Sequence, residues 1–252
     1  MKKLNAIIIG GTKGIGLAIT ENFLKENKIV HVISRNRNLK LENRLRKQFA
    51  NSIFFYNCDA TNLEEFSLIR NNILDNSNGN IDIIVSNVGN GSGSLGLNQD
   101  NNEWNYSWSV NFDSAYNSYK IFIEDIIETK GVITFISSIA GIEDLGAPIS
   151  YSVAKSSVIS LSKSISKRVG ANVRVNTVAP GNIITKDGTW DLKMQKNPTK
   201  IKKMLREKVP LRRFGKPQEV ADLISFLSSD KAKFITGACI VIDGGQTNKL
   251  NI

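Results

Sequence analysis

The chain has 252 residues, of which 41% are hydrophobic and 22% are charged, and its net charge at pH 7 is +10. These values fit one large globular domain and exclude an intrinsically disordered chain. Only two cysteines occur, Cys58 and Cys239, so a disulfide framework is excluded as well. No apolar run reaches the ~18 residues of a membrane span, and the apolar stretch after Lys3 is too short for a signal peptide, so we expect a cytoplasmic protein.

Short apolar, β-branched runs alternate with helical stretches along the whole chain. The pattern predicts strands at 5–9, 29–34, 53–57, 81–86, 131–137, 173–178 and 238–242. Helices are predicted at 15–27, 39–50, 62–75, 102–129, 150–169 and 217–228. The alternation predicts an α/β fold: a single doubly wound Rossmann-type domain over residues 1–252, with a parallel seven-stranded sheet and helices on both faces.

Two connections are longer than this fold requires. One is a loop at 87–100 that is rich in Gly, Ser and Asn, and the other is an irregular basic stretch at 181–209. Long connections inside a compact domain are usually functional or disordered. We therefore expect residues 182–209 to form a substrate lid.

A glycine-rich turn separates the first predicted strand from the first predicted helix. Glycines permit a sharp turn and a close approach of the backbone to a pyrophosphate, and the N-terminus of the helix attracts the anion. The residues expected to bind a dinucleotide here are Gly10, Thr12, Lys13, Gly14, Ile15 and Gly16.

The end of the second predicted strand indicates which nicotinamide cofactor is bound. An acidic residue at this position is typical of an NAD site, whereas a cation suits the 2′-phosphate of NADP. Ser34 and Arg35 occupy this position without an acid beside them, and Lys13 supplies a second cation. A guanidinium pairs well with a phosphate, so the sequence predicts NADP(H).

The strongest chemical signal is the pair Tyr151 and Lys155, which an i, i+4 spacing places on one face of a helix. A free tyrosine has a pKa near ~10, and a neighbouring ammonium favours the phenolate, so we expect the pKa of Tyr151 to be lowered. Such a phenol can act as a general acid or base. Ser138 lies thirteen residues before Tyr151, directly after the fifth predicted strand.

Together these motifs resemble the short-chain dehydrogenase/reductase family, and the resemblance runs from about residue 4 to residue 247. The glycine spacing is G-x-x-x-G-x-G, with Gly10 in place of the family's usual Thr. The segment Ser86-Asn87-Val88-Gly89 is similar to the family's N-N-A-G, with two substitutions. Asp243-Gly244-Gly245 resembles the closing D-G-G of the family.

The resemblance assigns roles to individual residues. It implies four catalytic residues, Asn111, Ser138, Tyr151 and Lys155, in which Ser138 orients the substrate oxygen and Asn111 holds a water beside Lys155. Further cofactor contacts are implied at Asp59 for the adenine, at Asn87 and Gly89 for the backbone approach, at the turn Pro180–Gly181, and at Ile183 and Thr185 for the carboxamide. No metal site is expected.

These residues predict an NADP(H)-dependent oxidoreductase that reduces a carbonyl to a secondary alcohol, or runs the reverse reaction. The resemblance to 3-oxoacyl-[acyl-carrier-protein] reductases points to a 3-oxoacyl thioester, although two arginines that contact the carrier protein there have no match near Thr129 and Ala171. The polar loop and the lysines of 181–209 leave open a sugar or sugar-nucleotide derivative, with an anionic substrate among the options. A non-enzymatic NADP(H)-binding regulator is the alternative from another class.

The expected partners are a small molecule and further copies of the chain. Family relatives are usually tetramers, so the resemblance implies a homotetramer or a homodimer. The excess of positive charge raises nucleic-acid binding as an alternative, but no basic stripe interleaved with aromatic residues is present. We expect neither nucleic acid nor a membrane as partner.

Overall fold

Seven parallel strands form one sheet in the computed structural model, which describes residues 3–248. The strand order is β3-β2-β1-β4-β5-β6-β7. The strands are β1 (Asn5–Ile9), β2 (Ile29–Ser34), β3 (Ile53–Asn57), β4 (Ile83–Ser86), β5 (Val132–Ile136), β6 (Arg174–Pro180) and β7 (Cys239–Ile242). All five residues of β1 are buried, as expected for a central strand that is covered on both faces.

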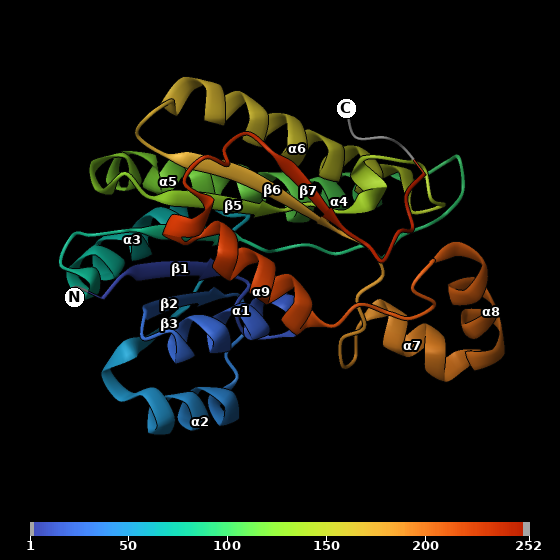
Figure 1. Cartoon of the computed structure of the whole chain (residues 1–252), viewed down its shortest axis with the longest axis horizontal. Coiled ribbons are helices and arrows are strands. Elements are labelled where there is room, and N and C mark those ends of the chain that lie inside the picture. Colours follow the sequence, from blue (N-terminus) through green and yellow to red (C-terminus); the bar gives the residue numbers. More distant parts are fainter. Residues whose placement is uncertain (1–2, 249–252) are drawn as a thin grey trace.

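Helices cover both faces of this sheet (Figure 1). One face carries α1 (Gly14–Lys25), α2 (Leu39–Phe49) and α9 (Pro217–Leu227), whose apolar residues share a core with Val30 and Val85. The other face carries α3 (Leu63–Ser77), α5 (Ser114–Thr129) and α6 (Ile149–Val169), which pack around Phe66, Phe122 and Phe135. The prediction of a doubly wound α/β fold with a seven-stranded parallel sheet is confirmed.

The strand order reverses between β1 and β4, so the chain leaves these two strands toward opposite faces. A crevice for ligands opens at such a point, outside the carboxyl ends of the strands. The predicted glycine turn follows β1 and the predicted loop 87–100 follows β4. The topology therefore brings both segments to this crevice.

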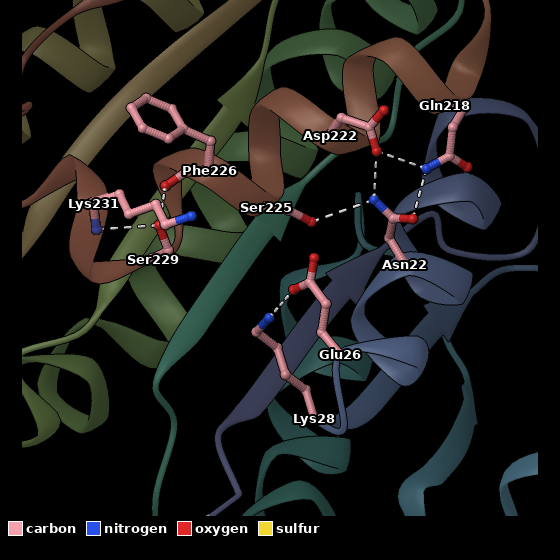
Figure 2. Close-up of polar contacts among 9 residues, drawn as sticks. All are labelled: Asn22, Glu26, Lys28, Gln218, Asp222, Ser225, Phe226, Ser229 and Lys231. Atoms are coloured by element: carbon pink, nitrogen blue, oxygen red, sulfur yellow. Dashed lines mark hydrogen bonds and ion pairs between the residues drawn. The ribbon is translucent and has the colours of Figure 1, made fainter.

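Polar side chains link α1 to α9 on the far side of the sheet from the tyrosine helix (Figure 2). Asn22 Nδ2 donates to Asp222 Oδ1 over 2.9 Å, and Gln218 Nε2 donates to Asn22 Oδ1 over 2.6 Å and to Asp222 Oδ1 over 2.8 Å. The group holds the first and last long helices of the fold together.

The predicted helical region 102–129 is confirmed, but its winding changes in the middle. The chain forms α4 (Asn101–Trp108), then a π-helical turn at Ser109–Asp113, and then α5. A π turn accommodates one extra residue in a helix and often marks a functional site. It contains Asn111, whose amide donates to the carbonyl of Ser107 over 2.8 Å.

The prediction of an irregular stretch at 181–209 is wrong, because this stretch contains α7 (Thr189–Lys196) and α8 (Pro198–Lys208). These helices have a small apolar core of their own, in which the ring centroids of Trp190 and Phe214 lie 5.6 Å apart. At the base, Ile184 N donates to Gly215 O and Gly215 N donates to Asn182 O, each over 3.0 Å. The predicted lid is thus a helical hairpin whose two ends are joined to each other (Figure 1).

Smaller differences concern the ends of elements. β4 begins at Ile83 rather than at 81, and the carboxylate of Asp82 just before it accepts a hydrogen bond from Asn5 N over 2.7 Å. β6 continues to Pro180 rather than to 178, because it pairs with β7 up to that residue. Within residues 3–248, no helix is both long and apolar enough to cross a bilayer, and no cluster of metal-binding side chains occurs.

Candidate active site

Tyr151 and Lys155 project from the first turns of α6 toward the carboxyl end of the sheet. The ring of Tyr151 packs against the loop after β4, since a Cβ atom added at Gly91 would lie 3.4 Å from Tyr151 Cζ. Its hydroxyl forms a hydrogen bond with the side chain of Ser138. Ser138 follows β5 and its Oγ also accepts a hydrogen bond from Ala140 N over 3.2 Å. The structure thus brings the phenol and the serine hydroxyl together.

Ser137, the neighbouring serine, faces another way. Its Oγ donates to the backbone carbonyl of Lys155 over 2.7 Å, and the residue is buried. This bond ties the end of β5 to α6 and leaves Ser138 as the hydroxyl beside Tyr151, as the spacing predicts.

Lys155 is a buried cation. Only 3% of the residue is exposed, and burial lowers the pKa of its ammonium to about 8. Its Nζ donates to the carbonyl of Ile136 over 3.1 Å and to that of Val88 over 3.4 Å. These two carbonyls, from the ends of β5 and β4, hold the ammonium at the crevice.

The expected lowering of the pKa of Tyr151 is not observed. Burial raises the pKa of this phenol, and the hydrogen bond with Ser138 opposes the rise. Desolvation disfavours a phenolate, and here it outweighs any attraction from Lys155. Tyr151 is therefore protonated at neutral pH and is ready to donate a proton.

Asn111 reaches the same place from the π turn. Its Oδ1 accepts a hydrogen bond from Asn90 N over 2.9 Å, and its Nδ2 donates to Asn90 O over 2.9 Å. A Cβ atom added at Gly89 would lie 3.1 Å from Asn111 Oδ1 and 2.9 Å from Lys155 Nζ. A side chain at this point of the loop would displace the ammonium of Lys155 or the amide of Asn111.

The glycine turn after β1 is shaped for close approach. Gly10 and Gly14 have φ values of +80° and +54°, which side chains rarely adopt. A Cβ atom at Gly16 would collide with the carbonyl of Gly10 and lie 2.6 Å from Asn87 Nδ2, which itself donates to Gly10 O over 3.1 Å. Three of the predicted cofactor residues complete the turn at the start of α1: Thr12 and Ile15, which are half-buried, and Lys13, which is exposed.

Arg35 and Asp59 lie side by side because β2 and β3 are neighbours. Arg35 Nη1 is 3.7 Å from Asp59 Oδ2, and more than half of the arginine side chain remains exposed. Asp59 is also held by the backbone and hydroxyl of Thr61. Ser34 Oγ donates to Asn36 O over 3.2 Å. Arg35 thus presents a positive charge at the edge where the adenosine half of a dinucleotide lies in this fold.

The turn after β6 lies on the other side of the crevice. Gly181 N, following Pro180, donates to Ile242 O over 3.0 Å, and a Cβ atom at Gly181 would lie 2.7 Å from Asp243 Cβ. Thr185 reaches α1, since a Cβ atom added at Gly14 would lie 3.3 Å from Thr185 Cγ2. The start of the segment 182–209 therefore touches the first residue of α1, and Ile183 forms the bridge to Gly215.

Two residues at the crevice carried no sequence signal: Gly91, which faces the ring of Tyr151, and Gln99, which contacts the start of α6. Their contacts span 60 and 51 residues, so only the tertiary structure reveals them.

Known proteins resemble the chain over almost all its length. Residues 10–247 match the family model described as "Enoyl-(Acyl carrier protein) reductase". The 3-oxoacyl-[acyl-carrier-protein] reductase FabG of Chlamydia trachomatis is 33% identical over 96% of both chains. The carbonyl reductase family member 4 of Xenopus laevis is 34% identical over 97% of this chain and 98% of its own. The chain belongs to the short-chain dehydrogenase/reductase family.

Solved structures also resemble this short-chain dehydrogenase/reductase. The L-sorbose reductase of Gluconobacter frateurii, in complex with NADPH and L-sorbose, gives a TM-score of 0.91 at 26% identity, covering 99% of this chain and 98% of its own. ElxO with NADP bound gives a TM-score of 0.88 at 29% identity, covering 97% and 99% of the two chains.

Proposed function

We propose that this protein is an NADP(H)-dependent reductase that converts a carbonyl to a secondary alcohol, or catalyses the reverse reaction. The observation that supports this most directly is the meeting of Tyr151, Ser138 and Lys155 beside a glycine turn at the crevice. The turn has the backbone conformation and the missing side chains that a pyrophosphate requires, so the residues present fit a dinucleotide.

NADPH, when bound, supplies the hydride. Tyr151 Oη donates a proton to the substrate oxygen, and the hydroxyl of Ser138 donates a hydrogen bond to the same oxygen and fixes its position. Lys155 would hold the ribose hydroxyls and, when protonated, favours the phenolate that Tyr151 becomes. Asn111 and the backbone of Asn90 form a polar path beside Lys155 through which Tyr151 regains its proton. The residues that would line the cofactor site are Thr12, Lys13, Ile15, Asn87 and Thr185, and Arg35, with Ser34, would bind the 2′-phosphate.

The proposal is tested with purified protein. NADPH and NADH are titrated by fluorescence, and a panel of acyl thioesters and keto-sugars is then assayed with NADPH. We expect tight binding of NADPH and turnover of at least one carbonyl. Tyr151→Phe should abolish turnover and change the Kd for NADPH less than two-fold. Failure to bind either cofactor would overturn the proposal, whereas tight binding without any Tyr151-dependent turnover would identify a non-enzymatic regulator.

For the substrate we propose a 3-oxoacyl thioester first, because relatives named 3-oxoacyl-[acyl-carrier-protein] reductase match the chain over 96% of its length. A polar, anionic sugar derivative is the second candidate, favoured by charge. Residues 182–213 contain ten basic and three acidic residues and so account for +7 of the net charge of +10. In the panel, a phosphorylated keto-sugar that is reduced at least ten-fold faster than its unphosphorylated form would favour this second class.

We also propose a homotetramer or homodimer in the cytoplasm, with residues 182–209 acting as a lid. Exposed apolar side chains lie on two surfaces: Phe226 and Phe234 beside α9, and Tyr116, Ile149 and Val153 on α5 and α6. Light scattering after gel filtration measures the mass, and a monomer at micromolar concentration would contradict the assembly.

A further inference from the structure

The helix that carries Tyr151 starts without a cap of its own. Pro148 precedes α6, and no side chain of that residue accepts a hydrogen bond from the first turn. The first N–H groups of a helix have no partner within the helix and need an acceptor from elsewhere. Tyr151 is the third residue of α6, so any fraying of this turn displaces the phenol.

Gln99 supplies the missing acceptor from a distant part of the chain. Its Oε1 accepts a hydrogen bond from Ser150 N over 2.9 Å. Ser150 is the second residue of α6 and directly precedes Tyr151, and it is 2% exposed. The bond spans 51 residues and fixes the first turn of the tyrosine helix to the end of the loop that follows β4.

The amide nitrogen of Gln99 binds that loop. Nε2 donates to Ser94 O over 3.0 Å and lies 3.4 Å from Glu103 Oε1, which also accepts from Ser94 N. The same loop touches α6 at two further points, because Gly91 faces Tyr151 and a Cβ atom at Gly93 would lie 3.3 Å from Pro148 Cβ. At its other end, Asn90 is held by Asn111.

From these contacts we propose that Gln99 is a positioning residue for the reaction, an inference that rests on the proposed reductase function. Its carbonyl oxygen caps α6 and fixes Tyr151, and its amide nitrogen holds the loop 90–99 over the substrate position. The two ends of one side chain thereby couple the shape of the substrate loop to the placement of the proton donor.

The test compares three variants. Gln99→Leu removes both bonds, Gln99→Glu keeps an acceptor for Ser150 N and removes the donor, and Gln218→Leu is the control. Gln218 is a glutamine that also links two elements, α9 and α1 (Figure 2). These helices pack in the core on the other face of the sheet from α6. Hydrogen exchange of the peptide 148–155 is measured in the NADPH-bound protein, together with kcat, KM and the Kd for NADPH.

For Gln99→Leu we expect exchange in this peptide to be about five-fold faster, because one capping bond is lost. We expect kcat to fall about ten-fold, because Tyr151 is less precisely placed. The Kd for NADPH should stay within two-fold of wild type. Gln99→Glu should keep the slow exchange and most of kcat but raise KM several-fold, since its carboxylate repels Glu103 and releases Ser94. Gln218→Leu should change none of these values.

Unchanged exchange in Gln99→Leu would overturn the capping role, and faster exchange with unchanged kcat would overturn the positioning role. Gln99→Asn, which is one methylene too short to reach Ser150, replaces Gln99→Leu if that variant does not fold. The exchange measurement needs no substrate. If the wild-type protein reduces no carbonyl, the proposed function fails while the effect of Gln99 on α6 is still decided.

Discussion

The burial of Lys155 lowers the stability of the folded protein. It is buried, it is held by only two backbone carbonyls, and burial lowers the pKa of its ammonium from 10.5 to about 8. A shift of this size corresponds to about 3 kcal/mol of disfavoured charge at neutral pH. A buried charge that destabilises the folded protein in this way is typical of functional residues.

We expect Lys155→Met to stabilise the cofactor-free protein by about 1–2 kcal/mol at pH 7 while abolishing turnover, because it removes the buried charge but leaves two carbonyls without a donor. Wild-type stability should rise from pH 8 toward pH 10.5, where the unfolded lysine still binds a proton that the folded one has lost. Urea unfolding at pH 7 and pH 10 measures both effects. A lower stability of Lys155→Met at pH 7 would contradict this account.

Arg35 offers a direct test of cofactor choice. Arg35→Asp replaces the cation at the end of β2 with the acid that suits a ribose 2′-hydroxyl, so the ratio of kcat/KM for NADPH over NADH should fall at least 100-fold. Arg44→Asp is the control, since Arg44 pairs with Glu21 on the surface at 2.7 Å. An unchanged ratio in Arg35→Asp would mean that this guanidinium does not meet the 2′-phosphate.

At the scale of elements, the turn between β1 and α1 depends on the absence of side chains. Gly16→Ala would press a methyl group into the carbonyl of Gly10, so we expect the affinity for NADPH to fall at least 100-fold. Gly79→Ala is the control, because Gly79 lies outside the turn and a Cβ atom there meets nothing within 4 Å, so that only its positive φ of +71° opposes the substitution. Isothermal titration with NADPH compares the two variants, and similar losses in both would argue against a local effect.

The elements differ in how well the sequence predicts them. The strands and the pair Tyr151 and Lys155 follow from local periodicity, because neighbours along one strand or helix keep a fixed spacing. The π turn at Asn111 was not predicted, since its extra residue is accommodated by bonds to a loop that lies 21 residues away. The contacts of Gln99 have the same non-local origin.

The helices α7 and α8 are a different case, since the sequence did contain a signal for α8. Asn197 accepts a hydrogen bond from Lys200 N over 3.0 Å, Pro198 takes the first helical position, and Ile201 and Leu205 follow with a spacing of four. This is an ordinary helix start, and the dense lysines around it obscured the pattern. No comparable local pattern predicts that Gly91 lies against the ring of Tyr151.

At the scale of the whole molecule, the buried imidazole of His31 makes the stability of the fold depend on pH in the acid range. It is fully buried in β2, its Nδ1 lies 3.1 Å from Tyr56 Oη, and its Nε2 lies 3.3 Å from Asn5 Oδ1. Phe54 stacks on it with ring centroids 5.2 Å apart. Burial lowers the pKa of His31 to about 4, so the ring stays neutral in the folded protein at neutral pH.

Because the unfolded histidine binds a proton near pH 6.5 and the folded one does so only near pH 4, stability should decline as the pH falls between these values. The loss should reach about 3 kcal/mol. Urea unfolding from pH 7 to pH 4 measures it, with His31→Gln as a variant that keeps hydrogen-bonding capacity without titrating in this range. Equal slopes in both proteins would assign the acid sensitivity to other groups.

The extra residue in the π turn also constrains how this chain can change in length. Successive residues of an α-helix are rotated by about 100° around its axis, so removing one residue from 109–113 would turn all of α4 relative to α5 by about that angle. The excision would yield a more regular helix and would carry Asn111 away from Asn90 and Gly89. A one-residue deletion in 109–113 should therefore disconnect the Asn111 amide from the proposed proton path, even though it makes the helix more regular.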